Sequence, residues 1–451
     1  MFKMKNNFFS KSLKQTILVG FLMAVSLVNG QWTQTSQTNT YSPVSGTVQN
    51  VGDFGYGTDN NGVEYMAYTE FLSGSNSTWD LVRVKKLNTT TKEWENFGPT
   101  YATTMKGRHP KIAFDSNNDI YIAFIDMVSG GGNNGTNKII IKKYDSGNST
   151  WNNAFGTVES TTSANVIGVA NQTLSNQNNS FDFDFAGTTP LVAINTTTTN
   201  AYVFLYNGSS WTNSLNNTAN YNGAGFDMAK NGNRVYFFYP NSSNNIQGVY
   251  YESGTWSALT GSGTFGGTFI PRMLIKFYNS DIYVSAVAAS PSRYVKLFKY
   301  SSGAYTDISS PIFASSVYGF NFDITPQGDP IAAYCLSTTS PTYSYSAIKY
   351  NGSSWTTVGC TNFTRGLTDG NILNTTSLDL IALSNTEYFI NTPSTNASIG
   401  LSFVYTPPSA PTITSFHPQV GQLDLQLPLQ EQISLVLQLY LLTELQLQVL
   451  L

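Results

Sequence analysis

One piece of sequence occurs seven times along this chain, and that repetition limits the possible folds more than any other feature. Each copy reads as an apolar strand, a short turn rich in Asn, Asp and Gly, and a second apolar strand, which predicts a β-hairpin. Because such turn residues tolerate positive φ, we expect tight two-residue connections. The copies begin at Gly55, Ile112, Phe183, Phe226, Ile275, Phe320 and Leu378.

A second piece follows each of the first six hairpins. It consists of a third strand, a turn and an aromatic residue, and these aromatics are Trp94, Trp151, Trp211, Trp256, Tyr305 and Trp355. Their spacings are 57, 60, 45, 49 and 50 residues. A period near 50 residues with four strands per unit is typical of β-propeller blades. We therefore predict an all-β fold over residues 31–405, a seven-bladed propeller of four-stranded antiparallel blades.

The pattern within each unit supports stacked blades. In segments 119–125 and 234–239 both alternating faces are apolar. An antiparallel strand buried on both faces must lie in a sheet that is covered on both sides, as a blade is by its neighbours. A row of separate β-sandwiches is the alternative, and it would show alternation of apolar and polar residues.

The seventh hairpin is followed by a third strand, residues 398–405, but by no Trp strand. The missing piece lies at the other end of the chain, where residues 31–35 (Gln-Trp-Thr-Gln-Thr) resemble residues 354–358 (Ser-Trp-Thr-Thr-Val). We expect the N-terminal strand to complete the last blade, because this closes the ring and removes an open sheet edge.

Residues 1–30 have the layout of a bacterial secretory signal peptide: a basic start, an apolar run over 16–28 and a small-residue exit at Asn29-Gly30. The basic residues are Lys3, Lys5, Lys11 and Lys14. An uncleaved anchor is the alternative. The mature chain, with 19 basic and 26 acidic residues, has a net charge of −7. It has no basic cluster, so we expect no nucleic-acid partner. It has no further apolar run long enough to span a membrane, so we expect a secreted or cell-surface monomer with no membrane span.

The chain offers little material for histidine chemistry. His109 and His417 are the only histidines, which leaves no material for a Ser-His-Asp triad or a His-rich zinc site. We interpret His109 as a loop residue. Cys335 and Cys360 are the only cysteines; export permits a disulfide, yet they end the second and fourth strands of one predicted sheet, so both states stay open.

Residues 115–119, Asp-Ser-Asn-Asn-Asp, together with Asp126 loosely match the oxygen spacing of a calcium loop. Position six is Ile120 rather than Gly, and strands rather than helices flank the loop. We interpret it as a hairpin turn. The sequence thus predicts no catalytic residues, no metal ligands and no cofactor, and it does not identify the ligand-binding residues.

Two turns carry a family resemblance. Residues 145–151 (Asp-Ser-Gly-Asn-Ser-Thr-Trp) and 206–211 (Tyr-Asn-Gly-Ser-Ser-Trp) resemble the Asp boxes of sialidase-like propellers, and the repeats as a whole resemble kelch- and sialidase-like blades. In the sialidase family the box is a structural turn, and the catalytic site needs an arginine cluster. Arginine is scarce here, which puts that activity in doubt. The arginines are Arg83, Arg108, Arg234, Arg272, Arg293 and Arg365.

The C-terminal part changes character after the Pro-rich linker 406–411. Residues 410–416, Ala-Pro-Thr-Ile-Thr-Ser-Phe, resemble the start of an IPT/TIG immunoglobulin-like domain, and from His417 the composition switches to Leu and Gln. Permitted codons for 419–451, read in another frame, give a continuous β-type sequence that extends this resemblance. We therefore interpret 412–451 as a truncated, frameshifted IPT/TIG-like remnant that is disordered or loosely helical.

Propellers commonly use the loops at one end of the central axis for function. We expect a secreted or cell-surface, non-catalytic recognition module that binds a glycan or a protein at that end. The first alternative is a glycan-cleaving enzyme that uses an Asp/Glu pair in the axial pocket. The second is a structural spacer of a surface adhesin.

Overall fold

A computed structural model describes residues 31–37, 50–71, 81–99, 102, 107–126, 139–155, 181–195, 201–216, 225–265, 272–288, 293–314, 317–336, 345–359, 379–393 and 400–407. Trp32–Tyr405 form one compact unit. The predicted signal peptide, Cys360 and the IPT/TIG-like remnant lie outside the described residues. In the described part of the chain, no helix is long and apolar enough to cross a membrane.

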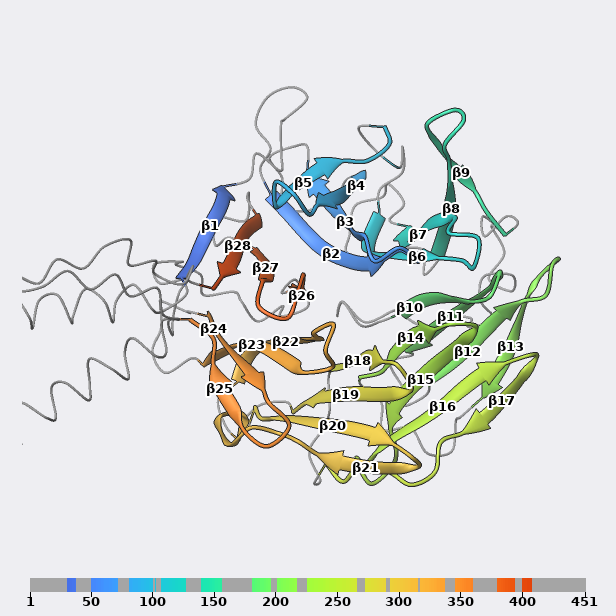
Figure 1. Cartoon of the computed structure of the whole chain (residues 1–451). Helices are drawn as coiled ribbons and strands as arrows, with labels where there is room; N and C mark the ends of the chain where they lie inside the picture. The colour runs from blue at the N-terminus through green and yellow to red at the C-terminus, as the bar shows by residue number, and fades with distance from the viewer. Residues whose placement is uncertain are drawn as a thin grey trace, which may run out of the picture. The chain divides into compact units, whose positions relative to one another are not determined.

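The described strands form seven four-stranded antiparallel sheets, which confirms the predicted fold (Figure 1). Blade 1 contains β2 (Asn50–Thr58), β3 (Glu64–Phe71), β4 (Leu81–Asn88) and β5 (Glu93–Asn96). Blade 2 contains β6 (Gly107–Phe114), β7 (Ile120–Asp126), β8 (Ile139–Asp145) and β9 (Thr150–Asn153). Blade 3 contains β10 (Phe181–Ala186), β11 (Thr189–Asn195), β12 (Ala201–Tyr206) and β13 (Trp211–Asn216).

The remaining blades follow in chain order. Blade 4 contains β14 (Asp227–Asn231), β15 (Arg234–Pro240), β16 (Ile246–Glu252) and β17 (Thr255–Ala258). Blade 5 contains β18 (Arg272–Tyr278), β19 (Asp281–Val287), β20 (Val295–Ser301) and β21 (Ala304–Asp307). A short 3-10 helix, η1 (Pro311–Phe313), precedes blade 6, which contains β22 (Val317–Ile324), β23 (Pro330–Leu336), β24 (Tyr345–Tyr350) and β25 (Trp355–Thr357).

Blade 7 is built from both ends of the unit. Its sheet order is β1-β28-β27-β26, with β26 (Asp379–Ala382), β27 (Tyr388–Pro393), β28 (Gly400–Thr406) and the N-terminal β1 (Gln31–Gln37). Figure 1 shows the blue β1 beside the red β28. The expected closure by the N-terminal strand is therefore confirmed.

Apolar clusters between neighbouring blades hold the ring together. The buried side chains form seven clusters, and each combines residues of two successive blades. Strand β7 shows the principle: Ile122 and Phe124 pack toward blade 1, whereas Tyr121 and Ala123 pack toward blade 3. The cluster of Phe54, Met66 and Trp94 with Phe389 joins blade 1 to blade 7 and completes the circle.

The hairpin turns confirm one expectation and correct another. Gly62, Asn118, Gly187 and Gly328 are among the turn residues with positive φ, as predicted. Two-residue turns join the first two strands only in blades 3, 4 and 5. The other four blades leave five residues between their paired strands. The expectation of uniform two-residue turns was wrong because side-chain oxygens, such as that of Asp59, accept backbone N–H groups and stabilise a wider turn.

Blades 1 and 2 approach each other through bare backbone. A Cβ atom placed on Gly55 of β2 would lie 1.9 Å from the carbonyl oxygen of Pro110 in β6, and one on Gly57 would lie 2.6 Å from that of Ile112. Glycine is required at these two positions because any side chain would push the inner strands apart.

We predict that Gly55→Ala lowers the free energy of unfolding by about 3 kcal/mol, because the added methyl group overpacks this contact. The control is Gly147→Ala in an exposed turn, where the change should stay within about 0.5 kcal/mol. Urea denaturation of both variants measures the difference. Equal stabilities of the two variants would show that β2 and β6 do not approach each other this closely.

Trp32 secures the closing strand. Its side chain is 8% exposed, its Nε1–H donates to the carbonyl oxygen of Val358 in blade 6 at 3.1 Å, and its ring centroid lies 5.4 Å from that of Tyr405. This one residue therefore links β1 to β28 and to the neighbouring blade.

We predict that Trp32→Ala costs about 3–5 kcal/mol of stability. Trp32→Phe, which keeps ring packing but loses the hydrogen bond, should cost less. Deletion of residues 31–38 should lower the melting temperature at least as far as Trp32→Ala. A deletion variant that melts at the parent temperature would disprove closure by β1.

Candidate functional site

The innermost strands of all seven blades line one cavity of about 390 Å³ on the propeller axis. Small-molecule sites in proteins commonly occupy about 300–1,000 Å³, so this space can admit a ligand. Charged or amide side chains from six of the blades line it: Lys111, Asp182, Asp184, Asp227, Lys230, Arg272, Lys276, Asn321 and Asp379. We call this space the axial cavity.

Several of these carboxylates hold the next blade in place. An innermost strand pairs on one side only, so its other edge leaves backbone N–H groups without a strand partner. Asp182 Oδ2 of β10 accepts the Met228 N–H of blade 4 at 3.0 Å. Asp227 Oδ2 of β14 accepts the Ile275 N–H of blade 5 at 2.6 Å.

The same device recurs between blades 6 and 7, where Asp323 Oδ2 of β22 accepts the Ala382 N–H at 2.8 Å. These carboxylates therefore satisfy open strand edges as well as lining or approaching the axial cavity.

Lysines compensate part of the acidic charge. Lys111 lies 3.4 Å from Asp182, and Lys276 lies 3.4 Å from Asp323. Lys230 reaches across from blade 4 and donates to the Phe114 carbonyl oxygen of blade 2 and to Asn60 Oδ1 of blade 1. Burial lowers the pKa of Lys230. Its ammonium group thus ties three blades together beside the axis.

The guanidinium of Arg272 is also buried, at the start of β18. Burial lowers the pKa of Arg272 to about 10, and the neighbouring Asp227 partly opposes that shift. Arg272 still carries its positive charge at neutral pH.

Other carboxyl groups near the axis have strongly raised pKa values. Burial raises the pKa of Asp184 to about 7 and that of Glu64 to about 7. Burial, followed by the nearby charge of Asp182, raises the pKa of Asp227 well above its ordinary value. Removal from water penalises the charged form of a carboxyl group, so these side chains hold protons at pH values where an exposed acid would not.

Asp379 at the start of β26 is the extreme case. It is 6% exposed, and within the described part of the chain its Oδ2 has no hydrogen-bond partner. Burial raises the pKa of Asp379 to about 8; Glu64 and Asp323 add to the shift, while Lys276 opposes it. This is a buried carboxyl oxygen, on a residue that lines the cavity, whose hydrogen-bonding capacity is unused.

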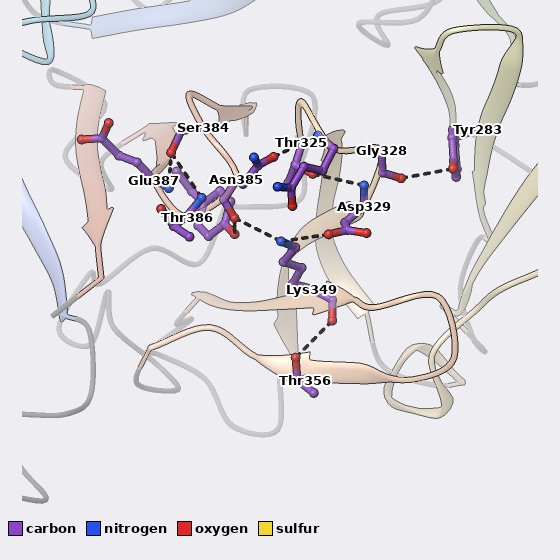
Figure 2. Close-up of polar contacts among 12 residues, drawn as sticks. Tyr283, Thr325, Gly328, Asp329, Lys349, Thr356, Ser384, Asn385, Thr386 and Glu387 are labelled. Atoms are coloured by element: carbon purple, nitrogen blue, oxygen red, sulfur yellow. Dashed lines mark hydrogen bonds and ion pairs between the residues drawn. The ribbon is translucent and has the colours of Figure 1, made fainter. Parts of the chain in front are cut away.

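The hairpin end of the ring is cross-linked by polar contacts, as Figure 2 shows for blades 5 to 7. The Gln327 N–H donates to Asn385 Oδ1 at 2.9 Å, and Lys349 Nζ donates to the Asn385 carbonyl oxygen at 3.1 Å. The Tyr283 hydroxyl donates to the Gly328 carbonyl oxygen at 3.3 Å. These contacts connect neighbouring blades, so the polar side chains at this end of the ring stabilise the fold.

Residues 115–119, which loosely match a calcium loop in sequence, form a turn of this kind. Asp115 Oδ1 accepts the N–H groups of Asn117 and Asp119, both at 2.9 Å, and Asp119 lies 2.5 Å from Lys143. The side chain of Asp126 lies outside the described residues. Where the structure describes the chain, it contains no group of three or more His, Cys, Asp or Glu side chains that could hold a metal ion.

His109 differs from expectation. It lies within β6, at a β-bulge where the register shifts, and it is buried with a φ of 49°. The interpretation as a loop residue was wrong, because the bulge takes up the irregular Arg-His-Pro segment without ending the strand.

Cys335 is buried in β23, and the disulfide question stays open because Cys360 is outside the described residues.

The turns that resemble Asp boxes lie between third and fourth strands, as expected. Asp145 Oδ1 accepts the Gly147 N–H at 3.0 Å, and Asn207 Oδ1 accepts the Ser209 N–H at 3.0 Å. Both are exposed local turns.

Aromatic residues serve packing in the described part of the propeller. Trp94 and Trp151 are buried, and no Phe, Tyr or Trp among the side chains that the structure describes is exposed. Two half-buried aromatic residues, Tyr56 and Phe277, line the axial cavity, so an aromatic surface is present there.

The acidic residues at the axis were missed from the sequence, although a signal exists. An Asp stands between two apolar residues at the start of three hairpins: Phe181-Asp182-Phe183, Phe226-Asp227-Met228 and Leu378-Asp379-Leu380. An acid within an otherwise apolar inner strand marks a side chain directed at the axis.

No protein-family model matches this chain, and curated proteins include no match. Solved structures with a similar fold include the Aleuria aurantia lectin in complex with a fucosyl-GlcNAc (13% identity, TM-score 0.44, covering 70% of this chain and 97% of the lectin). A Penicillium chrysogenum α-L-arabinanase has 8% identity and a TM-score of 0.43, covering 84% and 96%. A Dyadobacter fermentans protein of unknown function has 11% identity and a TM-score of 0.43, covering 79% and 95%. Likenesses this distant assign no ligand or activity to this chain.

We predict that the propeller is less stable in alkaline than in mildly acidic solution. Asp184, Glu64 and Asp379 have raised pKa values when folded, so the folded state binds protons that the unfolded chain releases above about pH 4. The stability that these groups contribute is complete below pH 4 and is lost as the pH rises through 7–8.

Between pH 5.5 and 8.5 the melting temperature should fall by about 5 °C or more. Differential scanning calorimetry measures this change, and Asp379→Asn should remove the part of the slope near pH 8. A melting temperature that rises over this interval would contradict the assignment of buried, protonated carboxyl groups.

Proposed function

We propose that the mature chain is a secreted or cell-surface, non-catalytic recognition module that binds the end of a glycan in the axial cavity. The observation that carries this proposal is a cavity of about 390 Å³ lined by the inner strands of all seven blades and rich in charged and amide side chains. Export is inferred from the signal-peptide layout of residues 1–30.

The size of the cavity favours a small ligand over a protein surface. A stable protein interface buries about 800 Å² on each partner, which a central cavity of this kind does not offer. A one- or two-unit sugar fits the volume and presents hydroxyl groups that both donate and accept hydrogen bonds. Lys111, Arg272 and Asn321 can donate to such hydroxyls, and the carboxylates can accept from them.

A glycan-cleaving enzyme is the second candidate, because carboxyl groups of both protonation states lie near the axis. Asp184 and Asp379 hold protons near neutral pH, as a general acid must. The enzyme ranks second because Asp182, Asp227 and Asp323 accept backbone N–H groups of the next blade. Carboxylates committed to the scaffold are poorly placed to exchange protons with a substrate.

The test is a glycan array on the recombinant propeller, followed by calorimetric titration with each sugar that binds. We expect binding that Arg272→Met abolishes or weakens at least about tenfold, while Asp145→Asn in an exposed outer turn leaves the affinity unchanged. Release of sugar from bound glycans would support the enzyme. Binding to proteins but to no glycan would favour a protein ligand, and no binding at all would favour the spacer.

A further inference from the structure

Among the polar groups at the axial cavity, Asp379 is the one whose burial is least explained by the contacts around it. It stands at the start of β26, where it pairs in register with Asn391, and the following Leu380 is fully buried between blades 6 and 7. The Asp379 side chain lines the axial cavity, and its Oδ2 has no hydrogen-bond partner in the described part of the chain.

The charged groups around Asp379 come from three other strands. Lys276 and Arg272 belong to β18, Glu64 begins β3, and Asp323 lies near the end of β22. Lys276 forms its ion pair with Asp323 rather than with Asp379. Lys276 favours a negative charge on Asp379, whereas Glu64 and Asp323 disfavour it. The two bases also disfavour a cationic ligand next to Asp379.

A buried carboxylate is stable only when ion pairs or hydrogen-bond donors replace the water it has lost. The Leu380 N–H and the charge of Lys276 favour the ionised form of Asp379 in part. Its Oδ2 has no donor among the described residues, so the ionised form is costly there. The neutral acid avoids that cost and places a hydroxyl hydrogen on a group that lines the cavity.

We infer that Asp379 serves the axial cavity as an uncharged carboxylic acid whose O–H donates to an oxygen of an uncharged, oxygen-rich ligand such as a sugar. The ligand half of this inference rests on the proposed function, whereas the protonation half does not. An alcohol, ring or carbonyl oxygen of the ligand accepts the hydrogen bond, and an ammonium group is rejected.

The raised pKa of Asp379, about 8, agrees with this geometry. It also predicts a sign for the pH dependence. Below pH 7 the acid is neutral and can donate; above pH 8 it ionises, loses its hydrogen and can no longer make the bond.

The first experiment reads the proton directly. Infrared difference spectra between the parent and Asp379→Asn should contain the C=O stretch of a protonated carboxylic acid at pH 6, and this band should vanish by pH 9.5. The control pair is the parent and Asp281→Asn, because Lys299 holds the pKa of Asp281 below its usual range. That pair should show no such band at pH 6.

If Asp379→Asn does not fold, Asp379→Ser takes its place in the difference spectrum, because Asp184 and Glu64 also hold protons at pH 6 and contribute to the parent band. A difference spectrum with no band of a protonated carboxylic acid at pH 6 would overturn the inference.

The second experiment measures binding of N-acetylglucosamine, glucosamine and the methyl glycosides of galactose, mannose and glucose by calorimetric titration. We expect an uncharged sugar to bind at pH 6, at least about tenfold more weakly at pH 9.5, and glucosamine to bind more weakly than N-acetylglucosamine. Asp379→Asn keeps an uncharged donor and should bind without this pH dependence.

A preference for glucosamine, or an affinity that rises with pH, would overturn the ligand half of the inference. If no sugar binds at any pH, the proposed function and the ligand half fail together. The infrared band then still decides the protonation of Asp379 by itself.

Discussion

The fold depends on the burial of both faces of every blade by its two neighbours. A four-stranded sheet such as that of blade 2 is apolar on both sides, so it cannot be stable alone or at the end of a row. Tyr121 and Ile122 are adjacent in β7, yet they pack against different blades. A closed circle is the arrangement that satisfies all seven sheets, which explains why the first strand of the unit pairs with the last.

Stacking buries both faces of each blade, but it leaves each innermost strand with an open edge at the axis. Asp182, Asp227 and Asp323 answer that need by accepting backbone N–H groups of the following blade. The carboxyl groups are thereby concentrated near the axis, and their burial raises several of their pKa values. The scaffold and the candidate site therefore share the same groups, and this explains why acids at the axis are not by themselves a sign of catalysis.

The sequence predicted the blades well because the signals for them are local. The strand periodicity, the turn residues and the recurring Trp can each be recognised within a window of about ten residues. The match between residues 31–35 and 354–358 revealed that the N-terminal strand closes the ring. The axial groups could not be assigned in this way, since Asp227 and its partner Ile275 are brought together only by the stacking of blades. His109 was misjudged for a related reason, because a bulge can keep an irregular segment inside a strand.

The bond from Trp32 to Val358 joins residues 326 positions apart. Hairpins within a blade form from neighbouring segments and can appear early. The contact of Trp32 with Val358 forms only when a loop that contains almost the whole propeller has closed. We therefore infer that ring closure is a late event in folding, and that the partly folded chain presents the unpaired edge of β28 until β1 arrives. Such an intermediate is where two chains could exchange first strands, so the folding yield should depend on protein concentration.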